Sequence, residues 1–118
     1  MIALNATTRV FVALDPVDLR KSFNGLQGLV QERLRQDPLS GHVFVFLNRD
    51  RTRLKLLTWD GSGLWVATKR LEAGCFPRPA GEGESCQLRP EEFSALLNGL
   101  VVVARKEWYR TDVKKIAA

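Results

Sequence analysis

Runs of apolar residues and alternating patterns along the chain predict a set of short strands. Residues 43–47 (VFVFL) are apolar at every position, which is typical of a central strand covered on both faces. Five further segments are rich in β-branched or aromatic residues, or alternate between apolar and polar positions. These segments, each expected to form a strand, are 8–14, 53–59, 64–70, 85–88 and 101–104.

A longer pattern with helical spacing follows the first predicted strand. Asp15 suits the N-cap of a helix, and Pro16 suits its first turn because the missing proline N–H would be unpaired there in any case. Pro38 disfavours helical geometry in the residue before it, so the helix is expected to end near Gln36. The apolar residues that recur at three- and four-residue spacing, and form the predicted buried stripe, are Leu19, Phe23, Leu26, Leu29, Val30 and Leu34.

A second, shorter helix is predicted near the end of the chain. Pro90 is followed by two carboxylates, Glu91 and Glu92, and the helix dipole favours negative charge in the first turn. Gly99 is the expected end of this helix. Its predicted buried face consists of Phe93, Leu96, Leu97 and Leu100.

A hairpin is predicted around residues 60–63 (DGSG), which have the composition of a tight turn. If this hairpin closes symmetrically, alternate residues of its two strands share one face. That face is apolar near the turn and cationic far from it. Its residues are Arg53, Lys55, Leu57 and Trp59 on the first strand and Val66, Thr68 and Arg70 on the second.

Together these elements predict an α+β fold. We expect a small antiparallel β-meander with a long amphipathic helix after the first strand and a second short helix near the C-terminus. The chain has 118 residues, of which 45% are hydrophobic and 26% charged, and these values predict a single domain over residues 1–118. A basic C-terminal tail is expected from about residue 105.

The charge of the chain favours an anionic partner. Lys and Arg total 18 against 13 Asp and Glu, which gives a net charge of +5. Cations and aromatic residues are interleaved, so the cations could neutralise phosphates while rings stack on unpaired bases. The candidate nucleic-acid-binding residues are Arg49, Arg51, Arg53, Lys55, Trp59, Lys69, Arg70, Arg105, Lys106 and Arg110. The alternative is that these charges form only a solvated face that gives solubility.

Other kinds of site find little support in the sequence. Cys75 and Cys86 form no CxxC pair and His42 is the only histidine, so neither a zinc site nor a Ser-His-Asp system is indicated. A two-metal site needs converging carboxylates, whereas Asp15 is explained by helix capping and Asp60 by a tight turn. We therefore expect no catalytic activity, no metal and no cofactor.

No segment suits a membrane span or a secretory leader. The longest apolar stretches, 43–47 and 100–104, are far shorter than the ~20 residues of a membrane-spanning helix. The N-terminus lacks a charged region followed by a long apolar run. A cytoplasmic location is expected, with no membrane partner.

Three motifs span Asp18 to Leu26, Trp59 to Gly63 (WDGSG) and, after five residues, Lys69 to Glu72 (KRLE). Their order and spacing resemble the accessory protein, often called TnpB, of bacterial insertion sequences of the IS66 family. Ala67 and Thr68 stand where that family commonly has an aromatic pair. The resemblance covers about residues 9–100 and implies participation in DNA transposition beside a separate DDE-type transposase.

Two modes of action are compatible with this resemblance. In the first, the protein binds DNA, largely without sequence preference, through the cations named above. In the second, it is an assembly factor that binds the transposase without contacting DNA, and the segment 69–79 (KRLEAGCFPRP), with Phe76 exposed, is the docking element. Salt would distinguish the two modes. Binding to phosphates weakens steeply as the salt concentration rises, whereas binding through an apolar protein interface weakens little. The sequence leaves the oligomeric state open.

Overall fold

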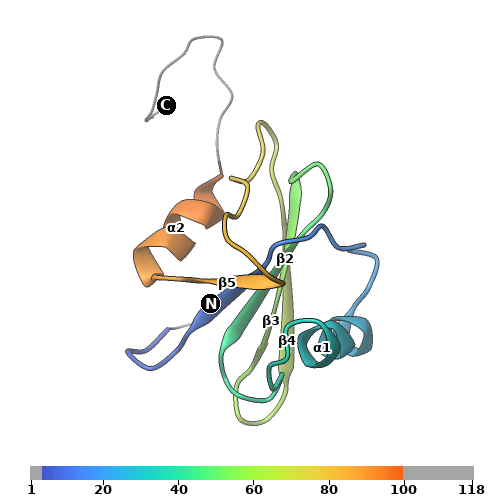
Figure 1. Cartoon of the computed structure of the whole chain (residues 1–118), viewed down its shortest axis with the longest axis vertical. Helices are drawn as coiled ribbons and strands as arrows, with labels where there is room; N and C mark the ends of the chain where they lie inside the picture. The colour runs from blue at the N-terminus through green and yellow to red at the C-terminus, as the bar shows by residue number, and fades with distance from the viewer. Residues whose placement is uncertain (1–3, 100–118) are drawn as a thin grey trace.

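A computed structural model describes residues 4–99 of the chain. Its centre is a five-stranded mixed sheet with the strand order β4-β3-β2-β1-β5, and the two helices lie on opposite sides of it (Figure 1). The elements are β1 (Val10–Ala13), α1 (Phe23–Glu32), β2 (Val43–Leu47), β3 (Arg53–Trp59), β4 (Leu64–Arg70), β5 (Ser85–Leu88) and α2 (Pro90–Asn98).

The central strands are β1 and β2, and every residue of both is buried. They pair in parallel, and the chain between them crosses one face of the sheet through α1. All other pairs in the sheet are antiparallel. The apolar run 43–47 is therefore a strand covered on both faces, as its sequence predicts.

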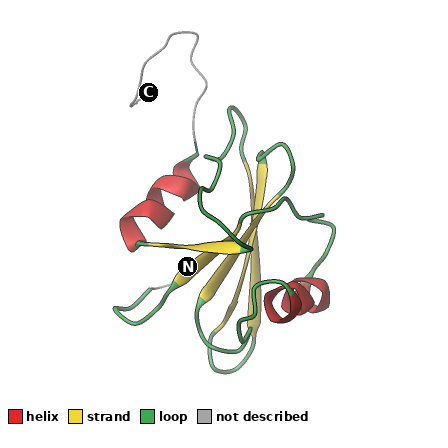
Figure 2. Ribbon diagram, in the orientation of Figure 1, coloured by secondary structure: helices red, strands yellow, loops and turns green. Residues whose placement is uncertain are grey.

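Each face of the sheet carries its own apolar core. On the α1 face, the rings of Phe11 and Phe44 stack with centroids 5.6 Å apart, and Leu26 and Val30 of the helix cover them. On the opposite face, Phe93 and Leu96 of α2 pack on strands β1 to β3 together with Phe76. Figure 2 shows this three-layer arrangement of helix, sheet and helix.

The predicted fold class was wrong in two respects. The sheet is mixed rather than an antiparallel meander, because β1 joins it parallel to β2. The helix after the first strand is also short, since α1 comprises only residues 23–32 instead of about 16–36. The first strand covers Val10–Ala13, within the predicted 8–14.

The segment before α1 explains why the helix begins late. Val17 N–H donates to Leu47 O (2.9 Å), which keeps the chain against the sheet. The Asp18 carboxylate accepts from Arg20 N–H (3.0 Å), and such a local bond competes with helix formation. Asp15 does not cap a helix; its carboxylate forms an ion pair with Arg33 (3.2 Å).

The predicted helical stripe holds only in part. Leu26, Val30 and Leu34 are buried, but Phe23, the first residue of α1, is 46% exposed. Its expected burial was therefore wrong. Residues 20–22, which lead into α1, are also exposed, so the start of the helix lies on the solvent side.

The hairpin and the second helix follow their predictions. Strands β3 and β4 pair symmetrically about the turn, so Lys55 lies opposite Thr68 and Leu57 opposite Val66. α2 begins at Pro90, and Gly99 follows its last residue with a φ of 74°, a backbone conformation that favours glycine. The predicted strand 101–104 lies outside the described residues.

The loop between β4 and β5 turns Phe76 inward. Phe76 is 0% exposed, so its predicted role as an exposed docking residue was wrong. Its N–H donates to Arg51 O (2.6 Å), which ties the loop to the turn between β2 and β3. Within residues 4–99, neither helix is long or apolar enough to cross a membrane.

Candidate nucleic-acid interface

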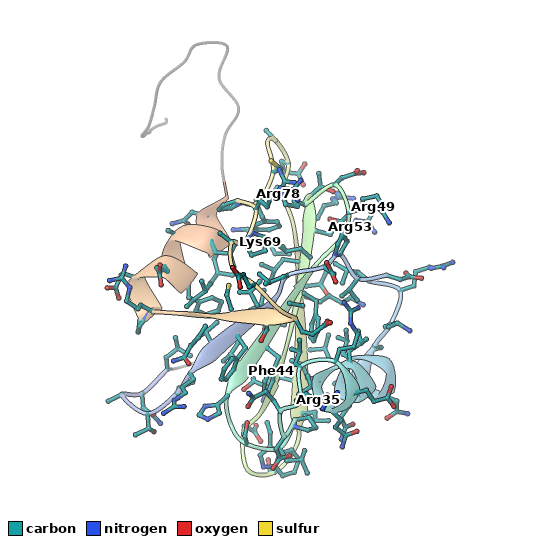
Figure 3. All side chains as sticks on the ribbon, in the orientation of Figure 1. Arg35, Phe44, Arg49, Arg53, Lys69 and Arg78 are labelled. Carbon is teal, nitrogen blue, oxygen red and sulfur yellow. The ribbon has the colours of Figure 1, made fainter. Side chains whose placement is uncertain are left out.

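One end of the sheet brings three of the predicted cations, Arg49, Arg53 and Arg70, together with two further arginines. At this end β1 and β2 finish, β3 begins and β4 finishes, so residues from four separate segments meet. Figure 3 shows Arg49, Arg53 and Arg78 at this end, whereas Arg35 lies beside α1 at the other end. We call this region, consisting of Arg20, Arg49, Arg53, Arg70 and Arg78, the basic end; all five residues are exposed.

A shallow groove of about 420 Å³ runs across the basic end. Arg20, Arg49 and Arg53 line it. The other lining residues are the acidic Asp18 and Asp50 together with Pro16, Val17, Leu19 and Asn48. A smaller hollow adjoins the groove, shares Arg49 with it, and is also lined by Arg78. Both lie at the carboxyl ends of the parallel strands β1 and β2, the position where open sheets with parallel strands commonly bind ligands.

The turn that carries Arg49 is fixed by the side chain of Asn48. Its Oδ1 accepts from the backbone N–H groups of Thr52 (2.9 Å) and Arg53 (3.0 Å), and its Nδ2 donates to Thr52 Oγ1 (3.2 Å). The Asn48 side chain therefore supplies the hydrogen-bond acceptor that these two N–H groups would otherwise need from the backbone. Arg49 and Asp50 are left exposed at its tip.

Arg51 has a different environment from the arginines on either side of it. It adopts a positive φ of 57°, and its guanidinium Nε donates to Phe76 O (3.0 Å). Its Nη2 also lies 3.7 Å from Cys75 Sγ. The guanidinium of Arg51 therefore links two loops of the fold and is half-buried.

Arg70 of the basic end pairs with Glu72 (3.6 Å). The remaining predicted residues are dispersed. Lys55 Nζ donates to the backbone oxygen of Lys21 (2.9 Å). Lys69 lies on the α2 face, where its Nζ donates to Leu97 O (2.7 Å). Trp59 is half-buried at the end of β3 beside the hairpin turn. Arg105, Lys106 and Arg110 lie outside the described residues.

The structure adds two arginines that the sequence pattern did not single out. Arg20 precedes α1 and Arg78 lies in the loop after β4, so both are far in sequence from residues 49–53. Arg20 forms a 2.7 Å ion pair with Asp18, whose pKa is held well below its usual range by the hydrogen bonds from Arg20. These residues share a surface with Arg49 only in the folded protein, where β1 and β2 finish at the same end of the sheet.

The carboxylates do not form a metal centre in the described part of the chain. No group of three His, Cys, Asp or Glu side chains converges within residues 4–99. Asp15 and Asp18 face arginine partners, and Asp60 holds the hairpin turn as predicted, accepting from Ser62 N–H (2.8 Å) and Gly63 N–H (2.9 Å).

The fold and this surface define a small mixed-sheet protein with a basic sheet end beside a shallow groove. The chain belongs to the family of IS66 Orf2-like proteins, whose model matches residues 8–107. This family associates the chain with transposition as an accessory protein and is not a known catalytic family.

Two relatives come from Sinorhizobium fredii. The protein y4jC is 40% identical over 116 residues, which cover 98% of this chain and 94% of the relative. The protein y4hO is 38% identical over 100 residues, which cover 85% of this chain and 87% of the relative. No solved structure matches the chain.

Proposed function

We propose that this accessory protein acts in transposition by binding the phosphate backbone of nucleic acid at its basic end. One observation carries the proposal. Arg49, Arg53 and Arg78 are exposed beside one groove system, and within residues 4–99 none of them has a carboxylate within ion-pair distance. Guanidinium groups left without a protein partner are available for phosphate oxygens.

The groove suits a backbone contact better than base readout. A side chain reads base edges when a helix or a strand pair carries it into a groove of the duplex. Here the arginines project from loops and strand ends around a shallow hollow. Contacts of this kind position nucleic acid without selecting its sequence.

The alternative that the protein binds the transposase without contacting DNA loses its original structural support. That hypothesis relied on an exposed Phe76, and this ring is fully buried. Transposase binding is therefore treated as an outcome of the test below.

The test compares two double variants with the same change in net charge. Arg49→Glu/Arg53→Glu reverses two cations at the basic end. Arg9→Glu/Arg35→Glu reverses two exposed cations near the opposite end of the sheet, at the start of β1 and after α1. Fluorescence anisotropy with single- and double-stranded DNA at two salt concentrations gives the affinity and its salt dependence for each variant.

The basic-end variant should bind at least ~10-fold more weakly at low salt, and the slope of log K against log salt should become shallower by about 1 for each lost phosphate contact. The control variant should lose much less affinity. Equal losses in both variants would show that only overall charge matters. Unchanged DNA affinity in a folded basic-end variant, with reduced capture of the cognate transposase, would support the protein-binding alternative.

A further inference from the structure

β4 is an edge strand whose outer side pairs with no strand in the described part of the chain. Two hydrogen bonds, one at each end of the β3–β4 ladder, show which β4 residues direct their backbone N–H and C=O groups toward β3. Asp60 N–H donates to Gly63 O (3.0 Å) near the turn, and Leu71 N–H donates to Thr52 O (2.9 Å) at the far end. Hydrogen-bonded and non-hydrogen-bonded pairs alternate along an antiparallel ladder.

This alternation divides β4 into two sets of residues. Trp65, Ala67 and Lys69 direct their backbone N–H and C=O groups toward β3, as Gly63 and Leu71 do. The backbone groups of the intervening residues point away from the sheet. These outward-facing residues are Leu64, Val66, Thr68 and Arg70.

We propose that β4 pairs antiparallel with β4 of a second copy of this chain, with the two-fold axis beside Ala67. In this register Val66 faces Thr68 of the other copy and Leu64 faces Arg70, so every outward-facing residue meets another. A register centred on Val66 would place Arg70 opposite the turn residue Ser62. A register centred on Thr68 would place Leu64 opposite Glu72, beyond the end of the strand.

The side chains on the α2 face complement each other in the proposed register. Trp65 lies opposite Lys69 of the second copy as a non-hydrogen-bonded pair, in which cross-strand side chains are closest. The Trp65 ring is 55% exposed, and its Nε1 donates to Asp60 Oδ2 (2.7 Å). The indole is therefore oriented before the second copy arrives. Because Lys69 Nζ donates to Leu97 O of its own chain (2.7 Å), the aliphatic stem of Lys69 is the part that packs against the indole face of the second copy.

The charges on β4 select the antiparallel arrangement. In a parallel pair, Lys69 and Arg70 would lie beside the same residues of the second copy, and like charges side by side are destabilising. In the antiparallel pair these cations meet Trp65 and Leu64 instead. The two basic ends then lie at opposite ends of the seam between the copies, so each copy keeps its own groove accessible.

Sedimentation velocity over a range of protein concentrations tests the proposal on the full chain. A two-strand seam is small beside a standard interface of roughly 1,600 Å², so the wild type should show a concentration-dependent dimer. Thr68→Pro removes an outward N–H and should abolish dimerisation. Thr68→Val keeps that N–H and a β-branched side chain, so this control should dimerise. Trp65→Ala should raise the dimer dissociation constant at least ~10-fold.

Cysteine cross-linking tests the register independently of the proline variant. In a Cys75→Ser/Cys86→Ser background, Ala67→Cys should form a disulfide-linked dimer with oxidised glutathione, because the two Ala67 residues face each other across the axis. Thr68→Cys alone should not, since it faces Val66. Cross-linking at Thr68 but not at Ala67 would disprove the register.

A wild type that stays monomeric at every concentration would overturn the proposal. If the amides of Val66 and Thr68 were also protected from hydrogen exchange in that monomer, the edge would be covered by the same chain, outside residues 4–99.

Discussion

The turn between β2 and β3 and the turn between β3 and β4 are built on the same principle but present different chemistry. In the first, Asn48 Oδ1 accepts from two backbone N–H groups, those of Thr52 and Arg53. In the second, Asp60 Oδ1 accepts from the N–H groups of Ser62 and Gly63. One turn is part of the basic end. The other accepts a hydrogen bond, through Asp60 Oδ2, from the indole of the exposed Trp65 on β4.

The difference between these turns lies in the charge of the acceptor and in what supports each turn. Asn48 is a neutral amide, whereas Asp60 is a carboxylate whose pKa is held well below its usual range, mainly by the Ser62 N–H and also by the Trp65 indole. The first turn is also tied through Arg51 to the loop of buried Phe76. The stability of the basic turn should therefore depend on the packing of Phe76 in the core. The contribution of the hairpin turn to the free energy of unfolding should depend on pH.

The largest effect should come from removing the support of the basic turn. Phe76→Ala deletes a fully buried ring and should lower the free energy of unfolding by about 3–5 kcal/mol. The control Phe23→Ala removes a ring that is 46% exposed and should cost much less. Urea denaturation gives both values, and equal losses would contradict the burial pattern.

A smaller effect should come from Asn48→Ala, which removes the acceptor of two backbone hydrogen bonds in the basic turn. The free energy of unfolding should fall by about 1–3 kcal/mol. DNA affinity should fall as well, because Arg49 and Arg53 lose their fixed placement. Asn24→Ala, at an exposed position of α1, serves as the control and should change neither quantity appreciably.

The smallest effect should be the pH dependence of the hairpin turn. Because the folded-state pKa of Asp60 is lowered, its contribution to stability is present above the ordinary aspartate pKa of about 3.9 and is lost as the pH falls below it. Asp60→Asn should remove this part of the pH dependence. Asp50→Asn, at the tip of the basic turn, should retain it. Denaturation midpoints measured between pH 7 and about 3 give the comparison.

The elements that sequence analysis located correctly depend on local information. The ranges of β2, β3 and β4 match their predictions because alternation and turn residues specify strands over a few positions. The symmetric register of the hairpin follows from the turn at Asp60. α2 begins where Pro90 and its two carboxylates indicate a first turn.

The long helix was predicted wrongly because two local signals compete over the same residues. Apolar spacing from Leu19 favours a helix, but Asp18 accepts from the backbone and guanidinium of Arg20. In addition, the backbone N–H of Val17 donates to the backbone oxygen of Leu47, the last residue of β2. This hydrogen bond joins residues about thirty positions apart, so no short-range sequence pattern could reveal it.

The sequence by itself determined the family, the excess of positive charge and the short elements whose patterns are local. Only the tertiary structure decided that β1 lies parallel to β2, and that Arg20 lines the groove and Arg78 the adjoining hollow, both beside Arg49. It also decided that Phe76 is buried and that Trp65 is exposed. The physical reason is that burial and proximity depend on which surfaces remain after the sheet has assembled, and the assembly involves contacts between residues far apart in the chain.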